Sequence, residues 1–270
     1  MIPFRNDVSK LIVRCGEWDT QHTTEPYPHQ DVGVESIQIH PEFNPRNLAN
    51  DFAVMFLKEN FLLDFNIDTV CLPEPGQNFD GSTCFATGWG KDEFGADGRF
   101  QVVLKEIEIP TVDSNTCQAK LRSTRLGQRF RLDPSFMCAG GVPGKDTCKG
   151  DGGGPLVCAT YDEPDTYRQA GIVAWGIGCG GDTPGVYAEV SKAVCWIDLV
   201  TSCRSSGGQY SHFGFTTSQC GSWLADTKQR LQALPARIRG SIEAQYNQCT
   251  VSYYDEQTLD ISQFARVKQN

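Results

Sequence analysis

The chain has 270 residues, 39% of them hydrophobic, which is enough to bury one large core or two modest ones. Its formal net charge of −9 repels phosphate groups, so we expect neither nucleic acid nor an acidic membrane as a partner. No apolar run reaches the roughly 20 residues that a helix needs to cross a bilayer.

Short apolar and β-branched runs, separated by Gly, Pro, Asn and Asp, predict an all-β fold of sandwich or barrel type. Residues 34–39 alternate with period two, whereas residues 52–57 form a continuous apolar run, which is typical of a buried strand. In chain order, the predicted strands are residues 11–15, 34–39, 52–57, 102–109, 171–175 and 186–190.

The composition changes after Cys203, where residues 204–208 have the sequence of a flexible linker. Beyond the linker, Ser222 can cap a helix that Pro235 ends, and Ile238 and Ile242 suggest a second one. Two interpretations stay open for this extension. We favour an appendage closed by a Cys220–Cys249 bridge and packed on the rest of the protein; the alternative is an independent binding module.

Twelve cysteines indicate an oxidising compartment and hence a secreted, extracellular protein. Zinc sites use close pairs such as Cys-x-x-Cys, which do not occur, and the four histidines are scattered along the chain. We therefore expect no metal cluster and no cofactor. Residues 1–7 carry charges where a signal peptide is apolar, so we expect the chain to be a fragment, an isoform or a truncated gene product.

Five motifs occur in the order and spacing of one known family. Residues 150–155, Gly-Asp-Gly-Gly-Gly-Pro, resemble the nucleophile loop Gly-Asp-Ser-Gly-Gly-Pro of chymotrypsin- and trypsin-like serine proteases. Residues 50–57 resemble the segment that carries the triad aspartate, which places Asp51 in that position. The remaining motifs are residues 87–90, 174–180 and 184–190, the last followed by Trp196-Ile197.

The resemblance covers roughly residues 10–203 and implies two β-barrels with a cleft between them, a short C-terminal helix, and an extension at 204–270. The protease-homologue domain would span residues 1–203, with a first barrel at about 10–70 and a second at about 80–195. The family's first strands and its triad-histidine motif have no counterpart before residue 11. We therefore expect an incomplete N-terminal barrel with open strand edges.

The resemblance also implies three disulfides, Cys84–Cys158, Cys117–Cys138 and Cys148–Cys179. Each disulfide would stabilise the fold by about 2–4 kcal/mol. The sequence leaves the other six cysteines unassigned: Cys15, Cys71, Cys195, Cys203, Cys220 and Cys249.

Gly152 occupies the position of the nucleophilic serine, and a glycine has no side chain that can attack a carbonyl. Asp51 and Gly152 are therefore vestigial triad positions, and we expect no enzymatic activity. The main-chain N–H groups of Gly150 and Gly152 match the family's oxyanion hole, and backbone donors survive a change from Ser to Gly.

Asp146 lies six residues before Gly152, which is the position of the aspartate at the floor of a trypsin-like specificity pocket. Gly176 and Gly178 match the mouth of that pocket. Two interpretations stay open: the pocket still holds an Arg or Lys side chain, or it has collapsed.

In the family, the N-terminus freed by activation pairs with the aspartate at position 151. Without that partner, Asp151 should take up a proton, bind water or turn outward, and we expect a zymogen-like, partly disordered pocket.

Residues 17–25 resemble the calcium loop of some relatives, but the later ligands are not evident.

Residues 15–21 and 25–31 are similar to arthropod clip-domain serine protease homologues, a group that includes prophenoloxidase-activating-factor and masquerade-like proteins with the same Gly-for-Ser loop. The resemblance implies a secreted, non-catalytic cofactor that binds an active cascade protease or a prophenoloxidase-type pro-enzyme. Two alternatives remain: a trypsin-like serine endopeptidase, if Gly152 and the N-terminus are not authentic, and a truncated product with no stable fold.

Overall fold

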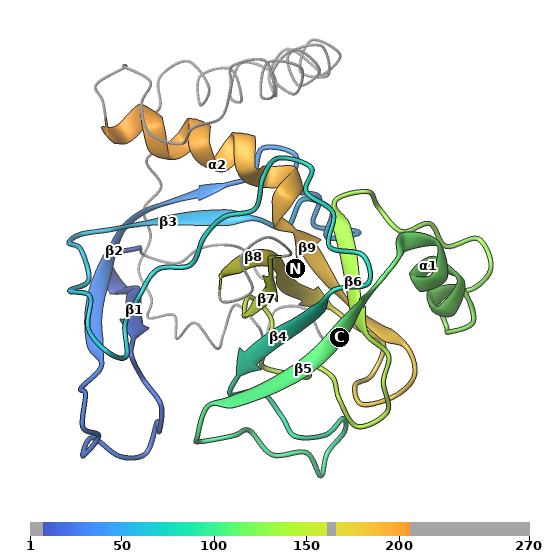
Figure 1. The fold of residues 1–270 in the computed structure, drawn as a ribbon, viewed down its shortest axis with the longest axis horizontal. Coiled ribbons are helices and arrows are strands. Elements are labelled where there is room, and N and C mark those ends of the chain that lie inside the picture. Colours follow the sequence, from blue (N-terminus) through green and yellow to red (C-terminus); the bar gives the residue numbers. More distant parts are fainter. Residues whose placement is uncertain (1–7, 161–165, 206–270) are drawn as a thin grey trace.

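The computed structural model describes residues 8–160 and 166–205 (Figure 1). Six strands close into a barrel in the order β4-β5-β6-β9-β8-β7, and three form a separate sheet in the order β1-β2-β3. The strands are β1 Ile12–Cys15, β2 Gln30–Ile39, β3 Ala53–Leu57, β4 Thr83–Gly88, β5 Lys105–Val112, β6 Phe136–Gly140, β7 Pro155–Ala159, β8 Tyr167–Trp175 and β9 Pro184–Glu189. The helices are η1 Val8–Lys10, α1 Ser114–Arg122 and α2 Val190–Ser205. The all-β class with one closed barrel, one partial barrel and a C-terminal helix is confirmed.

Most predicted strands coincide with observed ones, but the prediction for residues 102–109 begins too early. β5 starts at Lys105, because the preceding residues cross over to the first sheet. There the N–H of Leu104 donates to the Trp18 carbonyl at 2.8 Å, and Val103 forms a single bridge with Asp19. The helices suggested near Ser222 and Ile238 lie outside the described residues.

The closed barrel is filled by a tightly packed core around Tyr187, Ile109 and Leu156, none of which is exposed to solvent. Cys84 and Cys158 lie opposite each other on β4 and β7 and are joined by a disulfide inside this core. Cys117–Cys138 ties α1 to β6, and Cys148–Cys179 joins two loops of the site. These are the three pairings that the family resemblance implied.

The first sheet has a much smaller core: Leu11 and Val34 form its buried cluster, and Val32 of β2 is also buried. β1 and β3 each pair with β2 alone, so both are edge strands of the described sheet. The prediction of a buried strand at residues 52–57 is wrong: Phe52 is buried, but residues 53–57 are exposed or half-buried. The strand is covered only in part: Val54 packs against the cluster of Phe52 and Trp196, and Met55 and Leu57 pack against that of Leu11 and Val34.

Helix α2 connects the two parts of the molecule. Trp196 and Val190 pack in one apolar cluster with Phe52 of the first sheet and Ala188 of the barrel. Figure 1 shows α2 running along the side of β2 and β3. Within the described residues, no helix is both long enough and apolar enough to cross a membrane.

His40, at the end of β2, is part of this junction and is only 4% exposed. Its ring packs edge-on against Trp196, with 4.8 Å between ring centroids, and its Nδ1 accepts the N–H of Glu42 at 3.2 Å. Desolvation disfavours the charged imidazolium and lowers the pKa of His40 to about 4.

We predict that His40 makes the fold acid-labile. Its pKa is about 4 in the folded chain and about 6.5 when unfolded, so the unfolded state binds more protons between these values. The His40 contribution to stability is fully present above pH 6.5 and should fall by about 3 kcal/mol as the pH drops to 4. It is measured as the difference between thermal melts of the parent and of a His40 variant from pH 4 to 8, because other groups also titrate in this range.

The variant His40→Phe should flatten this part of the pH profile because it keeps the aromatic packing and removes the titrating ring. His22→Gln, at an exposed histidine, is the matched control. An unchanged pH profile in His40→Phe would show that other groups set the acid lability.

Candidate functional site

The loop at residues 150–155 leads into β7 and carries the position of the protease nucleophile. The Asp151 carboxylate holds the loop in place: it accepts the N–H of Gly90 on Oδ1 and the N–H of Cys148 on Oδ2, each at 2.8 Å. A β-carbon on Gly90 would clash with this carboxylate. This role for the Gly-Trp-Gly motif at residues 88–90 was not predicted from the sequence, although the motif itself was recognised.

Glycine is required at position 150 but not at position 152. Gly150 has a φ of 108°, and a β-carbon there would lie 2.7 Å from the Phe100 ring. Gly152, by contrast, is not among the glycines with positive φ. The φ at position 152 therefore imposes no need for glycine, and the place of Gly152 as the nucleophile position stays a prediction.

The backbone donors beside Gly152 are available for a ligand. Within the described residues, neither the Gly150 N–H nor the Gly152 N–H donates a hydrogen bond. The flanking Gly153 N–H donates to the backbone carbonyl of Val173 at 2.8 Å, and the Gly154 N–H donates to the backbone carbonyl of Asp151 at 2.8 Å. These two bonds fix the turn. Two free N–H groups on a fixed turn can bind a carbonyl oxygen or an anion.

Asp151 does not turn outward, contrary to one expectation from the sequence. Its carboxylate stays partly buried on the two backbone donors, and burial raises its pKa above the usual aspartate value. It forms no ion pair with any residue of 8–160 or 166–201 whose side chain is described. A buried carboxylate that binds two N–H groups but no cation is protonated more readily than one that also pairs with a cation.

Asp146 lies close to Asp151 at the base of a shared cavity of about 250 Å³. Its Oδ2 accepts the N–H of Gly180 at 3.1 Å, whereas its Oδ1 is buried and has no hydrogen-bond partner in the described structure. Burial, together with the nearby Asp151 charge, raises the pKa of Asp146 to about 6.

Gly176 and Gly178 do not line this cavity, whose walls come from the chain near Gly88 and Gly90, from the start of β5 and from Gly144. A β-carbon on Gly176 would lie 3.4 Å from the Gly178 carbonyl. The same loop reaches Asp146 through Gly180, whose N–H donates to Asp146 Oδ2. A role for Gly176 and Gly178 at the mouth of a pocket stays a prediction.

Asp51 lies just before β3 in a tightly turned loop and is half-buried. Leu48 and Asn50 both have positive φ, 62° and 54°. The N–H of Asn50 donates to Ser135 Oγ at 3.0 Å, which ties this loop to the barrel. The described histidine nearest in sequence, His40, packs into the apolar junction against Trp196. A triad role for Asp51 stays a prediction.

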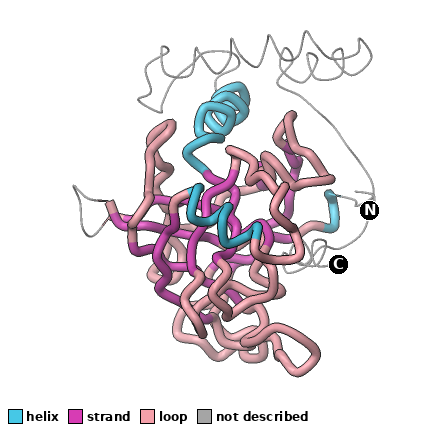
Figure 2. Tube along the Cα trace, turned by 90° about the vertical axis from the view of Figure 1, so that its right-hand side faces the viewer, coloured by secondary structure: helices cyan, strands magenta, loops and turns pink. Residues whose placement is uncertain are grey.

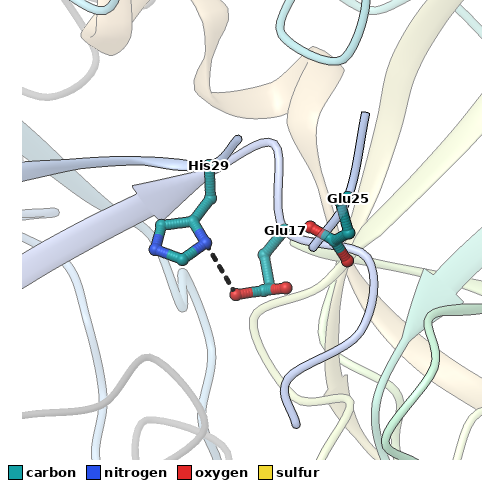
Figure 3. A group of neighbouring side chains, drawn as sticks. All are labelled: Glu17, Glu25 and His29. Carbon is teal, nitrogen blue, oxygen red and sulfur yellow. Dashed lines mark ion pairs between the residues drawn. The ribbon is translucent and has the colours of Figure 1, made fainter. Parts of the chain in front are cut away.

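Glu17, Glu25 and His29 form the one group within the described residues that could hold a metal ion, with ligand atoms within 4.8 Å of one another (Figure 3). The two carboxylates already have partners: Glu17 Oε2 lies 3.1 Å from His29 Nδ1 and 3.1 Å from Arg14 Nη1, and Glu25 Oε1 accepts the N–H of Asp19 at 2.7 Å. Calcium takes six to eight oxygen ligands, and a guanidinium and an imidazole stand in that space. These residues do not fit a calcium site.

We predict that calcium will not stabilise the fold. At 5 mM, a calcium site with a Kd of about 0.1 mM would add about 2 kcal/mol and raise Tm by several degrees. We expect melts with 5 mM calcium and with EDTA to agree within about 1 °C. Glu17→Gln is the matched variant, and a calcium-dependent Tm that disappears in this variant would contradict the ion-pair assignment.

We also predict that Asp146→Asn will stabilise the protein at pH 8. The folded pKa of Asp146 is about 6, above the unfolded value of about 3.8, so the native state binds more protons between these values and stability falls as the pH rises through them. Asparagine keeps the Gly180 contact and removes the buried charge. We expect a gain of about 1–3 kcal/mol at pH 8 and little change at pH 4, measured by urea unfolding.

Asp182→Asn, which changes an exposed aspartate in the same way, is the control for this variant. A loss of stability in Asp146→Asn at pH 8 would mean that the Asp146 charge is compensated in the folded protein.

Comparison with known proteins identifies the family. The sequence model of the trypsin family matches residues 4–197. The chain is 56% identical over 190 residues to phenoloxidase-activating factor 2 of Galleria mellonella, a match covering 70% of this chain and 63% of that protein. It is 43% identical over 189 residues to inactive CLIP domain-containing serine protease A28 of Anopheles gambiae, covering 70% of this chain and 49% of that protein.

Protein masquerade of Drosophila melanogaster is 37% identical over 197 residues, which cover 72% of this chain and 18% of masquerade. The chain thus spans about half to two thirds of the first two relatives and a small part of the third. The similarity to clip-domain serine protease homologues is confirmed by these matches, and the chain belongs to the trypsin family.

Proposed function

We propose that this chain is the protease-like part of a secreted, non-catalytic binding cofactor in a protease cascade of the kind that activates prophenoloxidase. The observation that carries the proposal is Gly152, at the position where the family has its nucleophile. The names of two relatives, phenoloxidase-activating factor 2 and an inactive CLIP protease, support the same role.

Glycine in place of the nucleophilic serine would lower the turnover of a serine protease by a large factor. In subtilisin, loss of the nucleophilic serine alone lowers turnover by about 10⁶, which corresponds to roughly 8 kcal/mol of barrier. No other described hydroxyl or thiol takes the place of that serine on the 150–155 loop. The rest of the scaffold is retained, including the closed barrel and its three disulfides. A stable scaffold without its nucleophile is suited to binding rather than to hydrolysis.

The partner we propose is another protein, either an active cascade protease or a prophenoloxidase-type pro-enzyme. The buried Asp146 carboxylate, whose pKa is raised to about 6, is a weak anchor for an Arg or Lys side chain. We therefore infer that recognition uses the outer surface of the molecule. The three disulfides support secretion, since such bonds persist in oxidising compartments.

The proposal is tested with the natural full-length protein in a reconstituted cascade of prophenoloxidase and its activating protease. We predict that adding the protein raises phenoloxidase activity while the protein itself releases no product from arginyl p-nitroanilide substrates. It should also form no adduct with diisopropyl fluorophosphate and should not bind benzamidine.

Gly152→Ser is the matched variant, since the backbone accepts a serine there, and it should support phenoloxidase activation as well as the natural protein does. A fluorophosphate adduct on the natural protein, or hydrolysis of the arginyl substrate by it, would establish the endopeptidase alternative instead. Unchanged phenoloxidase activity on adding the protein would contradict the cofactor role.

A further inference from the structure

One segment of this acidic protein is strongly basic. Residues 114–132, which comprise α1 and the loop after it, contain five of the chain's 24 Lys and Arg residues and none of its 33 Asp and Glu residues. The basic residues are Lys120, Arg122, Arg125, Arg129 and Arg131. Figure 1 shows α1 at the end of the molecule away from β1–β3, and Figure 2 looks onto that side, with α1 in front of the barrel strands.

The segment is rigidly held, although it lies mostly in a loop. Cys117 binds α1 to β6 through its disulfide with Cys138. The loop then folds back on the helix: Arg122 Nε donates to the Phe130 carbonyl at 2.8 Å, and the Leu132 N–H donates to Gln118 Oε1 at 3.0 Å. A basic surface that is already ordered loses little conformational entropy when it binds a partner.

The arginines on this surface carry uncompensated charge. Arg125, Arg129 and Arg131 are exposed and Arg122 is half-buried, and none of the four forms an ion pair with a described residue. Lys120 differs, because its Nζ donates to the Asp182 carbonyl at 2.7 Å and so braces the segment. We call the four arginines the arginine surface.

A cavity of about 650 Å³ opens on this surface, and Arg122 and Arg131 both line it. Gln118 and Asn47 add amide groups to its walls. Asp133 is the one carboxylate on the described lining, and its Oδ1 already accepts the Ser135 N–H at 3.0 Å. Two guanidinium groups beside neutral amides match the geometry of carboxylates, since arginine binds them through paired N–H donors.

We propose that the arginine surface is a docking site for a short acidic segment of a partner protein, with Asp or Glu side chains entering the cavity between Arg122 and Arg131. A long, uniform polyanion fits less well, because it would extend beyond these residues over a protein whose other charges are mainly negative. This site is separate from the 150–155 loop, and its test needs no cascade component.

The test uses a fluorescent octaglutamate peptide as the probe and anisotropy titration of the purified full chain at 50 mM salt. We expect saturable binding that weakens as salt increases. In the double variant Arg129→Glu/Arg131→Glu the Kd should rise at least tenfold, because two attractive charges become repulsive.

The matched control is Lys58→Glu/Arg99→Glu, which changes the net charge equally at exposed residues outside the segment. We expect its Kd to stay within about twofold of the parent, and melting curves establish that both variants fold. Equal weakening in both variants would overturn the proposal, since binding would then follow net charge alone. Failure of the peptide to bind would also overturn it.

Two further results would change the class of partner and so contradict the proposal. One is a heparin oligosaccharide that binds much more tightly than the peptide and loses this affinity in the Arg129→Glu/Arg131→Glu variant. That result would indicate a sulfated glycan as the partner. The other is self-association of the parent chain that the Arg129→Glu/Arg131→Glu variant abolishes, seen by light scattering, which would indicate a second copy of this chain.

Discussion

The arrangement of the site depends on the buried Asp151 carboxylate. Its two oxygens bind N–H groups from Gly90 and Cys148, and so join the end of β4 to the loop that precedes β7. This contact is possible because Gly90 has no β-carbon. A polar group removed from water needs such partners, since an unsatisfied carboxylate would cost several kcal/mol. The loop that held a nucleophile in related enzymes is thus kept in shape without one.

The site offers free backbone donors, whereas position 152 offers no side chain. The free N–H groups of Gly150 and Gly152 come from the turn itself, so they persist whatever residue stands at position 152. Asp146 and Asp151 line one cavity, which Lys91 and Lys105 also line, and neither aspartate forms an ion pair with a described residue. Burial disfavours both charges and raises both pKa values. Beside the first sheet, Arg14 and His29 each lie 3.1 Å from the Glu17 carboxylate.

The two surfaces at opposite ends of the molecule differ in kind. The β1–β3 end has open strand edges and a small core, whereas the α1 end is fixed by a disulfide and carries unpaired arginines. A fixed charged surface can recognise a partner by electrostatic complementarity, without a deep pocket. The proposed cofactor role and the arginine surface therefore rest on different parts of the chain.

The sequence by itself determined the fold class, because the order and spacing of motifs can be recognised without coordinates. The family resemblance carried by those motifs implied three of the cysteine pairs. The sequence misplaced the burial of residues 53–57 and the start of β5, since both depend on which other segments cover or attract the chain. Only the tertiary structure showed that Asp151 stays inward on two backbone donors, that Asp146 and Asp151 line one cavity, and that Arg122 and Arg131 line another. Desolvation and charge pairing depend on distances in space, which residue spacing along the chain does not specify.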